Sequence, residues 1–139
     1  MSGAAGGARH PRPGVTQDTA FFWEGLQQGE LRIQRCTACR MLRHPPGPMC
    51  PGCHSLDWDF VRSAGRGEIH SFVVAEHPPI PPFEYPNVIV LVALDEGTRL
   101  VSRLVGRAPE EVAIGQRVAV EYQAVDDDLT LHAFRPVEG

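Results

Sequence analysis

The chain has 139 residues, 42% of them hydrophobic and 22% charged, which suffices for one ordinary domain or two very small ones. All 13 basic residues are arginine, and they are spread unevenly. Seven arginines against five acids give residues 1–62 a net charge of +2, whereas six against twelve give residues 63–139 a net charge of −6. Proteins that bind nucleic acid usually carry a basic stripe, and the acidic second half shows the opposite, so we do not expect a nucleic-acid partner. A membrane helix needs a run of roughly 18 or more apolar residues, and the longest apolar run here, Val88–Leu94, is far shorter, so we do not expect a membrane partner either.

The N-terminal region divides into an arm and a helix. Residues 1–14 are mostly Gly, Ala, Pro and Arg with no large apolar side chain, which predicts a disordered arm. Thr16 can cap a helix over residues 17–28, and Gly29 can end it. The aromatic face of this helix either packs on its own domain or binds a partner subunit. Its candidate partner-binding residues are Phe21, Phe22 and Trp23.

The cysteines form two Cys-x-x-Cys pairs separated by ten residues. Alternating segments at 31–35 and 56–60 flank them and predict short strands, giving a zinc ribbon. Two such pairs supply a tetrahedral four-thiolate site, for which zinc is the favoured ion. A shell closed by four thiolates leaves no position for substrate, so the zinc would be structural. The predicted ligands are Cys36, Cys39, Cys50 and Cys53.

Other interpretations of these cysteines remain open at this point. They could form two disulfides, hold iron in a rubredoxin-like or iron–sulfur site, or stay as free buried thiols. His44 or His54 could replace one ligand. We see no secretory signal, and a thiolate site suits a reducing compartment, so we expect a cytoplasmic protein.

The second half of the chain predicts a small β-barrel. Residues 63–67 form a Gly-containing turn that we take as the boundary between a helix-plus-ribbon module (15–62) and a barrel module (63–139). A helical turn is expected near residues 109–112. Five strands with such a turn between the third and fourth match an OB-fold. The expected strands cover 69–76, 88–95, 98–105, 117–123 and 129–135.

A proline-rich loop follows the first barrel strand. Residues 77–86 contain five prolines, which excludes helix and strand and favours an extended, polyproline-like segment. Its apolar side chains are Ile80, Phe83 and Tyr85. We expect them to anchor a partner, since proline fixes the loop before binding and lowers the ordering cost. The alternative is that they cap the mouth of the barrel.

Several segments together resemble a domain-of-unknown-function family of acyl-CoA-associated proteins that join a rubredoxin-like zinc ribbon to an OB-fold. The resemblance runs in order over about residues 19–136. It departs from the family at His54, where many relatives have glycine, which eases the turn. The matching segments are Phe22-Trp23-Glu24-Gly25-Leu26, Leu31-x-x-Gln34-Arg35-Cys36-x-x-Cys39, Pro45-Pro46-x-Pro48-x-Cys50-Pro51-x-Cys53, Gly65-Arg66-Gly67, Leu104-Val105-Gly106 and Ile114-Gly115.

The resemblance implies a non-catalytic partner of thiolase-fold enzymes. Relatives look like subunits of acetoacetyl-CoA thiolase and HMG-CoA synthase assemblies, or of lipid-transfer-protein-like thiolases and aldolases acting on sterol side-chain CoA esters. In the latter systems a MaoC-like hydratase domain is often fused or paired. The acyl-CoA would then be shared with the partner. Arg99 and Arg103, on one strand face, could meet CoA phosphates, against the alternative of a plain solvated face.

Two other functions compete with the accessory subunit. OB barrels and zinc ribbons also bind single-stranded nucleic acid, which the acidic barrel argues against. An acyl-CoA enzyme in its own right would need an acid–base group, for which the candidates are His70, His77, His132 and the Asp126–Asp128 run. No serine or cysteine nucleophile motif accompanies them, so the accessory subunit is the favoured interpretation.

Overall fold

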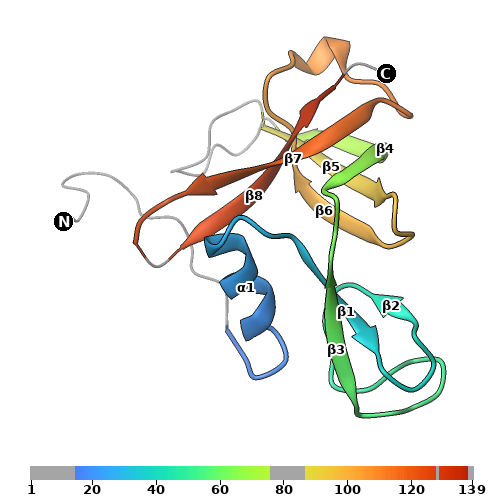
Figure 1. Cartoon of the computed structure of the whole chain (residues 1–139). Helices are drawn as coiled ribbons and strands as arrows, with labels where there is room; N and C mark the ends of the chain where they lie inside the picture. The colour runs from blue at the N-terminus through green and yellow to red at the C-terminus, as the bar shows by residue number, and fades with distance from the viewer. Residues whose placement is uncertain (1–14, 76–86, 128, 138–139) are drawn as a thin grey trace.

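The computed structural model describes residues 15–75, 87–127 and 129–137. Within these ranges one α-helix lies beside two antiparallel sheets, one of three strands and one of five (Figure 1). The expectation of a mainly β chain with an N-terminal helix is confirmed. The predicted arm and proline-rich loop lie outside the described residues. No helix in the described part of the chain is long and apolar enough to cross a membrane.

The helix α1 spans Ala20–Gln27 and is shorter than the predicted 17–28. Its N-cap is Thr19 and not Thr16. The Thr16 carbonyl instead accepts hydrogen bonds from the backbone N–H groups of Thr19 and Ala20, so a turn precedes the helix. Gly29 follows its end with φ of +74°, a conformation that glycine adopts without steric cost.

The three-stranded sheet is the ribbon. Strand β1 (Arg32–Cys36) is central and pairs antiparallel with β2 (Leu42–Arg43) and β3 (Trp58–Arg62). The third strand begins two residues later than predicted, because the chain is still turning after the second cysteine pair. Leu56, expected on its apolar face, is 68% exposed.

The five-stranded sheet curls into a nearly closed barrel (Figure 1), with strand order β6-β5-β4-β7-β8. An isolated parallel bridge between Leu104 and Phe134 joins the two ends of this order. A 3₁₀ turn, η1, over Pro109–Glu111 lies between the third and fourth barrel strands, as predicted. The strands are β4 (Arg66–Ala75), β5 (Asn87–Leu94), β6 (Arg99–Arg103), β7 (Arg117–Ala124) and β8 (Thr130–Pro136).

The first barrel strand begins at Arg66, three residues earlier than predicted, and absorbs a glycine that we had placed in a turn. A Cβ atom on Gly67 would lie 2.3 Å from the Ala93 carbonyl oxygen of β5. This glycine therefore permits close approach of two strands, which is the common reason for glycine inside a strand.

The buried core fills the barrel and extends under the helix. The fully buried barrel side chains include Ile69, Val90, Val92, Val118 and Phe134. Strand β5, predicted as buried throughout, alternates between buried and half-buried positions. Its outer face therefore stays available, and the helix packs beside the barrel at β8 and beside the ribbon at β1.

Candidate metal centre and adjoining groove

The four cysteine sulfurs converge at one end of the ribbon. All four Sγ atoms lie within 4.8 Å of one another. The Sγ atoms of Cys36 and Cys53 are 3.6 Å apart, and those of Cys39 and Cys50 are 3.5 Å apart. A tetrahedron with zinc–sulfur bonds of about 2.3 Å has edges of about 3.8 Å. The sulfur cage thus fits a four-thiolate zinc ion.

The two halves of the cage have the same backbone geometry. After each pair the chain reverses through a left-handed residue, Arg40 with φ of 71° and His54 with φ of 66°. Their backbone N–H groups donate to the carbonyls of Cys36 and Cys50, at 2.8 and 2.9 Å. Position 54 therefore needs the conformation that glycine favours, and histidine adopts it with the four sulfurs still together.

Backbone N–H groups lower the pKa of two of the four cysteine thiols. The backbone N–H of Cys39, 3.4 Å from the Cys36 sulfur, is the main cause that lowers the Cys36 pKa to about 6. The Cys50 pKa is also lowered, first by the backbone N–H of Cys53. The backbone N–H of Met41 acts on Cys39 in the same direction, but the contact with the Cys50 sulfur, 3.5 Å away, together with burial outweighs it and raises the Cys39 pKa to about 11. A bound dication favours the thiolate form of every ligand, so metal binding would release the Cys39 proton.

The structure bears on two alternatives for this site, namely disulfide bonds and a histidine ligand. All four thiols are free, so the two-disulfide interpretation is wrong. Neither His44 nor His54 joins the ligand cluster, which among the described residues contains cysteines alone. His44 packs instead against the ring of Phe22, with centroids 5.2 Å apart.

A buried glutamine fixes the arm between the two cysteine pairs. The Gln34 side chain is fully buried and forms two 2.9 Å hydrogen bonds with the backbone of Gly47, donating to its carbonyl and accepting from its N–H. Arg43 donates to the same carbonyl at 3.0 Å. The arm is thereby tied to the middle of the ribbon sheet.

The predicted partner-binding residues of the helix differ in exposure. Phe21 and Phe22 are buried, with 8% and 4% of their surface exposed, and Phe21 contacts the rings of Trp58 and Phe60. Trp23 is half-buried beside Phe22. The three loop residues Ile80, Phe83 and Tyr85 lie outside the described residues.

The two arginines predicted to bind CoA have different surroundings. Both lie on β6, four positions apart with Val101 midway between them. Arg103 donates to the Gln123 side chain at 2.7 Å. Arg99 instead lines a groove beside the helix.

That groove, about 600 Å³ in volume, lies between the helix, the ribbon arm and the outer face of the barrel. Sequence reasoning missed it, because its walls come from segments distant in the chain. His132 was considered only as an acid–base candidate, and His44 only as a metal ligand. The lining residues are Thr19, Phe22, Trp23, His44, Pro45, Pro46, Leu91, Arg99, Leu100, Val101 and His132.

The remaining acid–base candidates do not gather at one place. His70 is exposed on β4, while His77 and Asp128 lie outside the described residues. His132 is held through Nδ1, 2.7 Å from the Ser102 hydroxyl. Burial lowers the His132 pKa to about 4, helped by repulsion from His44.

Comparison with known proteins agrees with this two-part architecture. Residues 23–59 match the family described as "ChsH2, rubredoxin-like zinc ribbon domain", and residues 60–123 match "ChsH2, C-terminal OB-fold domain". The solved structure "Ltp2-ChsH2(DUF35) aldolase" contains a chain that is 54% identical, with a TM-score of 0.86 over 90% of this chain and 98% of that one.

Curated relatives carry several names. A "Probable enoyl-CoA hydratase alpha subunit" of Thermomonospora curvata is 54% identical over 93% of this chain, and a "3-oxo-4,17-pregnadiene-20-carboxyl-CoA hydratase alpha subunit" of Mycobacterium tuberculosis is 45% identical over 91%. This chain spans only 40% of the length of each. A "DUF35 domain-containing scaffold protein" of Pyrococcus furiosus is 31% identical over 89% of this chain and 96% of its own length.

The zinc-ribbon match and the sulfur cage identify the metal as structural zinc. The order of ribbon and barrel, the family matches and the near full-length likeness to a DUF35 chain lead to the same assignment. This chain belongs to the DUF35 family, with a ChsH2-type rubredoxin-like zinc ribbon followed by an OB-fold.

Proposed function

We propose that this chain is a non-catalytic accessory subunit that binds a thiolase-fold acyl-CoA enzyme and helps to form its acyl-CoA site. The observation that supports this most is the likeness to the DUF35 chain of an aldolase complex, at 54% identity over 98% of that chain. The scaffold name of the archaeal relative points the same way.

The site chemistry supports a structural role. The four thiols are committed to a closed metal cage, which leaves no coordination position for a substrate. Ser102, which could act as a nucleophile beside His132, is 8% exposed and does not line the groove. We infer that the bond-making residues belong to the partner.

The names of the relatives suggest a finer version of the proposal. The partner would be a lipid-transfer-protein-like aldolase or thiolase, and a MaoC-like hydratase would be a second partner, since two relatives are named hydratase alpha subunits. The substrate would be a steroid side-chain acyl-CoA, shared between subunits, in keeping with the pregnadiene compound in one of these names. A thiolate site suits the reducing cytoplasm, where we place the complex.

Partner contact would involve the half-buried Trp23 and the proline-rich loop with Ile80, Phe83 and Tyr85. The buried rings of Phe21 and Phe22 would hold the helix, and with it Trp23, in place for this contact. We place the boundary between the ribbon and barrel modules at residues 62 and 63. The ribbon would thus hold the helix rigid while the barrel carries the loop.

Co-expression with a thiolase-like protein encoded beside it tests the proposal. We expect the two to elute as one complex of defined mass, and the partner to turn over acyl-CoA faster with the chain than without it. A monomeric chain that forms no complex would contradict the proposal. So would turnover by the chain alone that is abolished by His132→Gln.

A further inference from the structure

The groove beside the helix has the size and lining of a small-molecule site. Its volume of about 600 Å³ falls in the range of sites that hold drug-sized ligands. Phe22 and Trp23 form one wall, the two prolines of the ribbon arm form another, and Leu91 and Val101 of adjacent barrel strands form the floor. Val101 is 61% exposed, so this apolar floor is accessible.

The groove carries one positive charge and no negative charge. None of its lining residues is Asp or Glu, although the barrel half of the chain has a net charge of −6. Arg99 forms no side-chain hydrogen bond or ion pair with any described residue. By contrast, Arg117 on β7 holds Asp95 with two hydrogen bonds of 2.9 Å. The Arg99 guanidinium is therefore available for an anionic ligand.

Two neutral histidines add hydrogen-bonding capacity. His132 is anchored through Nδ1 to Ser102, which leaves Nε2 for a ligand in the groove. Burial holds the pKa values of both His44 and His132 below the usual range, so neither ring is charged at pH 7. The groove thus combines one cation, two neutral ring nitrogens and extensive apolar walls.

We propose that this groove binds an amphipathic carboxylate of roughly 14–30 non-hydrogen atoms, with its carboxylate on Arg99 and its apolar body against Trp23 and Val101. An apolar body alone would leave the guanidinium without a partner, and a highly charged ligand would lose the aromatic and proline contacts. The arginine fork suits a carboxylate, which it can bind through two parallel hydrogen bonds. The proposal goes beyond the accessory-subunit role, because it concerns the isolated chain.

The test uses the full chain, labelled with ¹⁵N and titrated separately with dodecanoate and deoxycholate below their micelle concentrations. These two carboxylates distinguish a linear from a fused-ring body. We expect at least one to give saturable shifts of the Thr19, Leu91 and Val101 amides. Arg99→Gln should weaken binding by about tenfold or more, as expected for loss of a charge-assisted hydrogen bond. Arg66→Gln, at an exposed arginine of β4 that does not line the groove, should leave the affinity unchanged.

Neutral analogues supply the second control. Dodecanol and the methyl ester of deoxycholate should bind at least about tenfold more weakly than the matching acids. The proposal is overturned if neither acid binds up to about 1 mM, if the shifts lie away from the groove, or if Arg99→Gln and wild type bind equally. Equal binding of acid and neutral analogue would also overturn it, because the groove would then be an apolar surface without carboxylate preference.

Discussion

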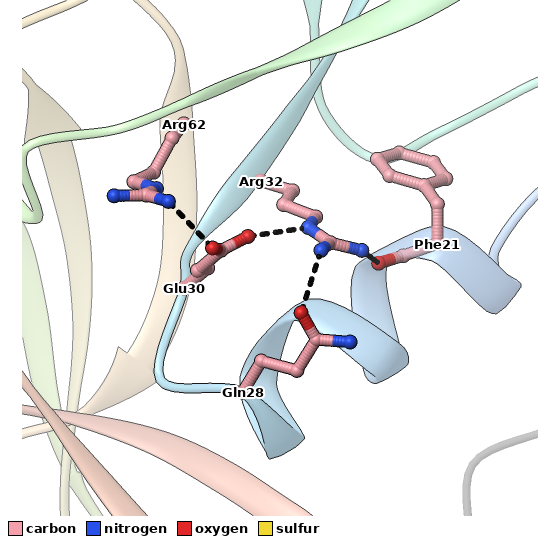
Figure 2. Close-up of polar contacts among 5 residues, drawn as sticks. All are labelled: Phe21, Gln28, Glu30, Arg32 and Arg62. Atoms are coloured by element: carbon pink, nitrogen blue, oxygen red, sulfur yellow. Dashed lines mark hydrogen bonds and ion pairs between the residues drawn. The ribbon is translucent and has the colours of Figure 1, made fainter.

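Arg32 and Glu30 form a 2.9 Å ion pair where the helix, the ribbon and the barrel meet (Figure 2). The second oxygen of Glu30 accepts from Arg62, at the end of β3, at 2.7 Å. Arg32 also donates to the Phe21 carbonyl and the Gln28 side chain, at 3.2 and 3.1 Å. One arginine thus joins the start of β1 to both ends of α1.

Arg32→Gln should destabilise the protein markedly. The substitution removes three hydrogen bonds and the cation–π contact with Phe60, whose ring centroid lies 4.5 Å from the guanidinium carbon. Because the Arg32 side chain is only 11% exposed, we expect a loss of about 2 kcal/mol in the free energy of unfolding. Urea denaturation of the zinc-loaded protein measures it.

Arg62→Gln is the matched control for this prediction. Arg62 binds the same carboxylate, but its side chain is 69% exposed, so the pair is screened by solvent. We expect a clearly smaller loss than for Arg32→Gln. Equal losses would mean that the carboxylate, and not the anchoring of the helix, determines the stability of this junction.

Cys50→Ser should empty the metal site and unfold the ribbon. Cys50 is fully buried, and its loss leaves three ligands where a structural site needs four. Elemental analysis should give one zinc per wild-type chain and a large loss in the variant. Cobalt-loaded wild type should show the absorption of a tetrahedral thiolate site. Full metal content in the variant would contradict the four-cysteine assignment.

Local signals predicted the cage and most strands, whereas the groove could not be predicted. Cysteine spacing is a short-range pattern, and alternation in residues 117–123 indicates the face whose Val118, Val120 and Tyr122 pack on the core. The groove depends on Phe22, His44 and Arg99, which only the packing of helix, arm and barrel brings together. Gly67 was predicted to lie in a turn, but it lies in β4, where the lack of a side chain lets the β5 backbone approach closely. The sequence alone does not distinguish these two uses of glycine.

His132 should make the protein less stable as the pH falls from 6.5 toward 4. Its pKa is about 4 in the folded chain, because burial disfavours the charged ring, and 6.5 is the ordinary value for an unfolded chain. The unfolded state therefore binds a proton in this window and the folded state does not, so acid favours unfolding. Integrated over the window, the loss is about 3 kcal/mol.

Urea midpoints measured at several pH values between 7 and 4 test this, with His132→Gln as the variant. The variant should show a flatter decline than wild type, while exposed His54→Gln should follow wild type. Acid also releases zinc from thiolates, but that contribution is common to all three proteins. Parallel curves for wild type and His132→Gln would show that His132 does not titrate as the structure indicates.

His54→Gly should stabilise the ribbon. His54 has φ of 66°, and a side chain in this left-handed region costs about 1–2 kcal/mol, whereas glycine gives back about 0.5–1 kcal/mol in backbone entropy. We expect a net gain of up to about 1 kcal/mol in the free energy of unfolding, with zinc content unchanged. Arg40→Gly, at φ of 71° in the other cysteine pair, should behave in the same way. Exposed Thr37→Gly, where φ is not positive, should instead destabilise, and a gain there would mean that glycine acts through something other than relief of backbone strain.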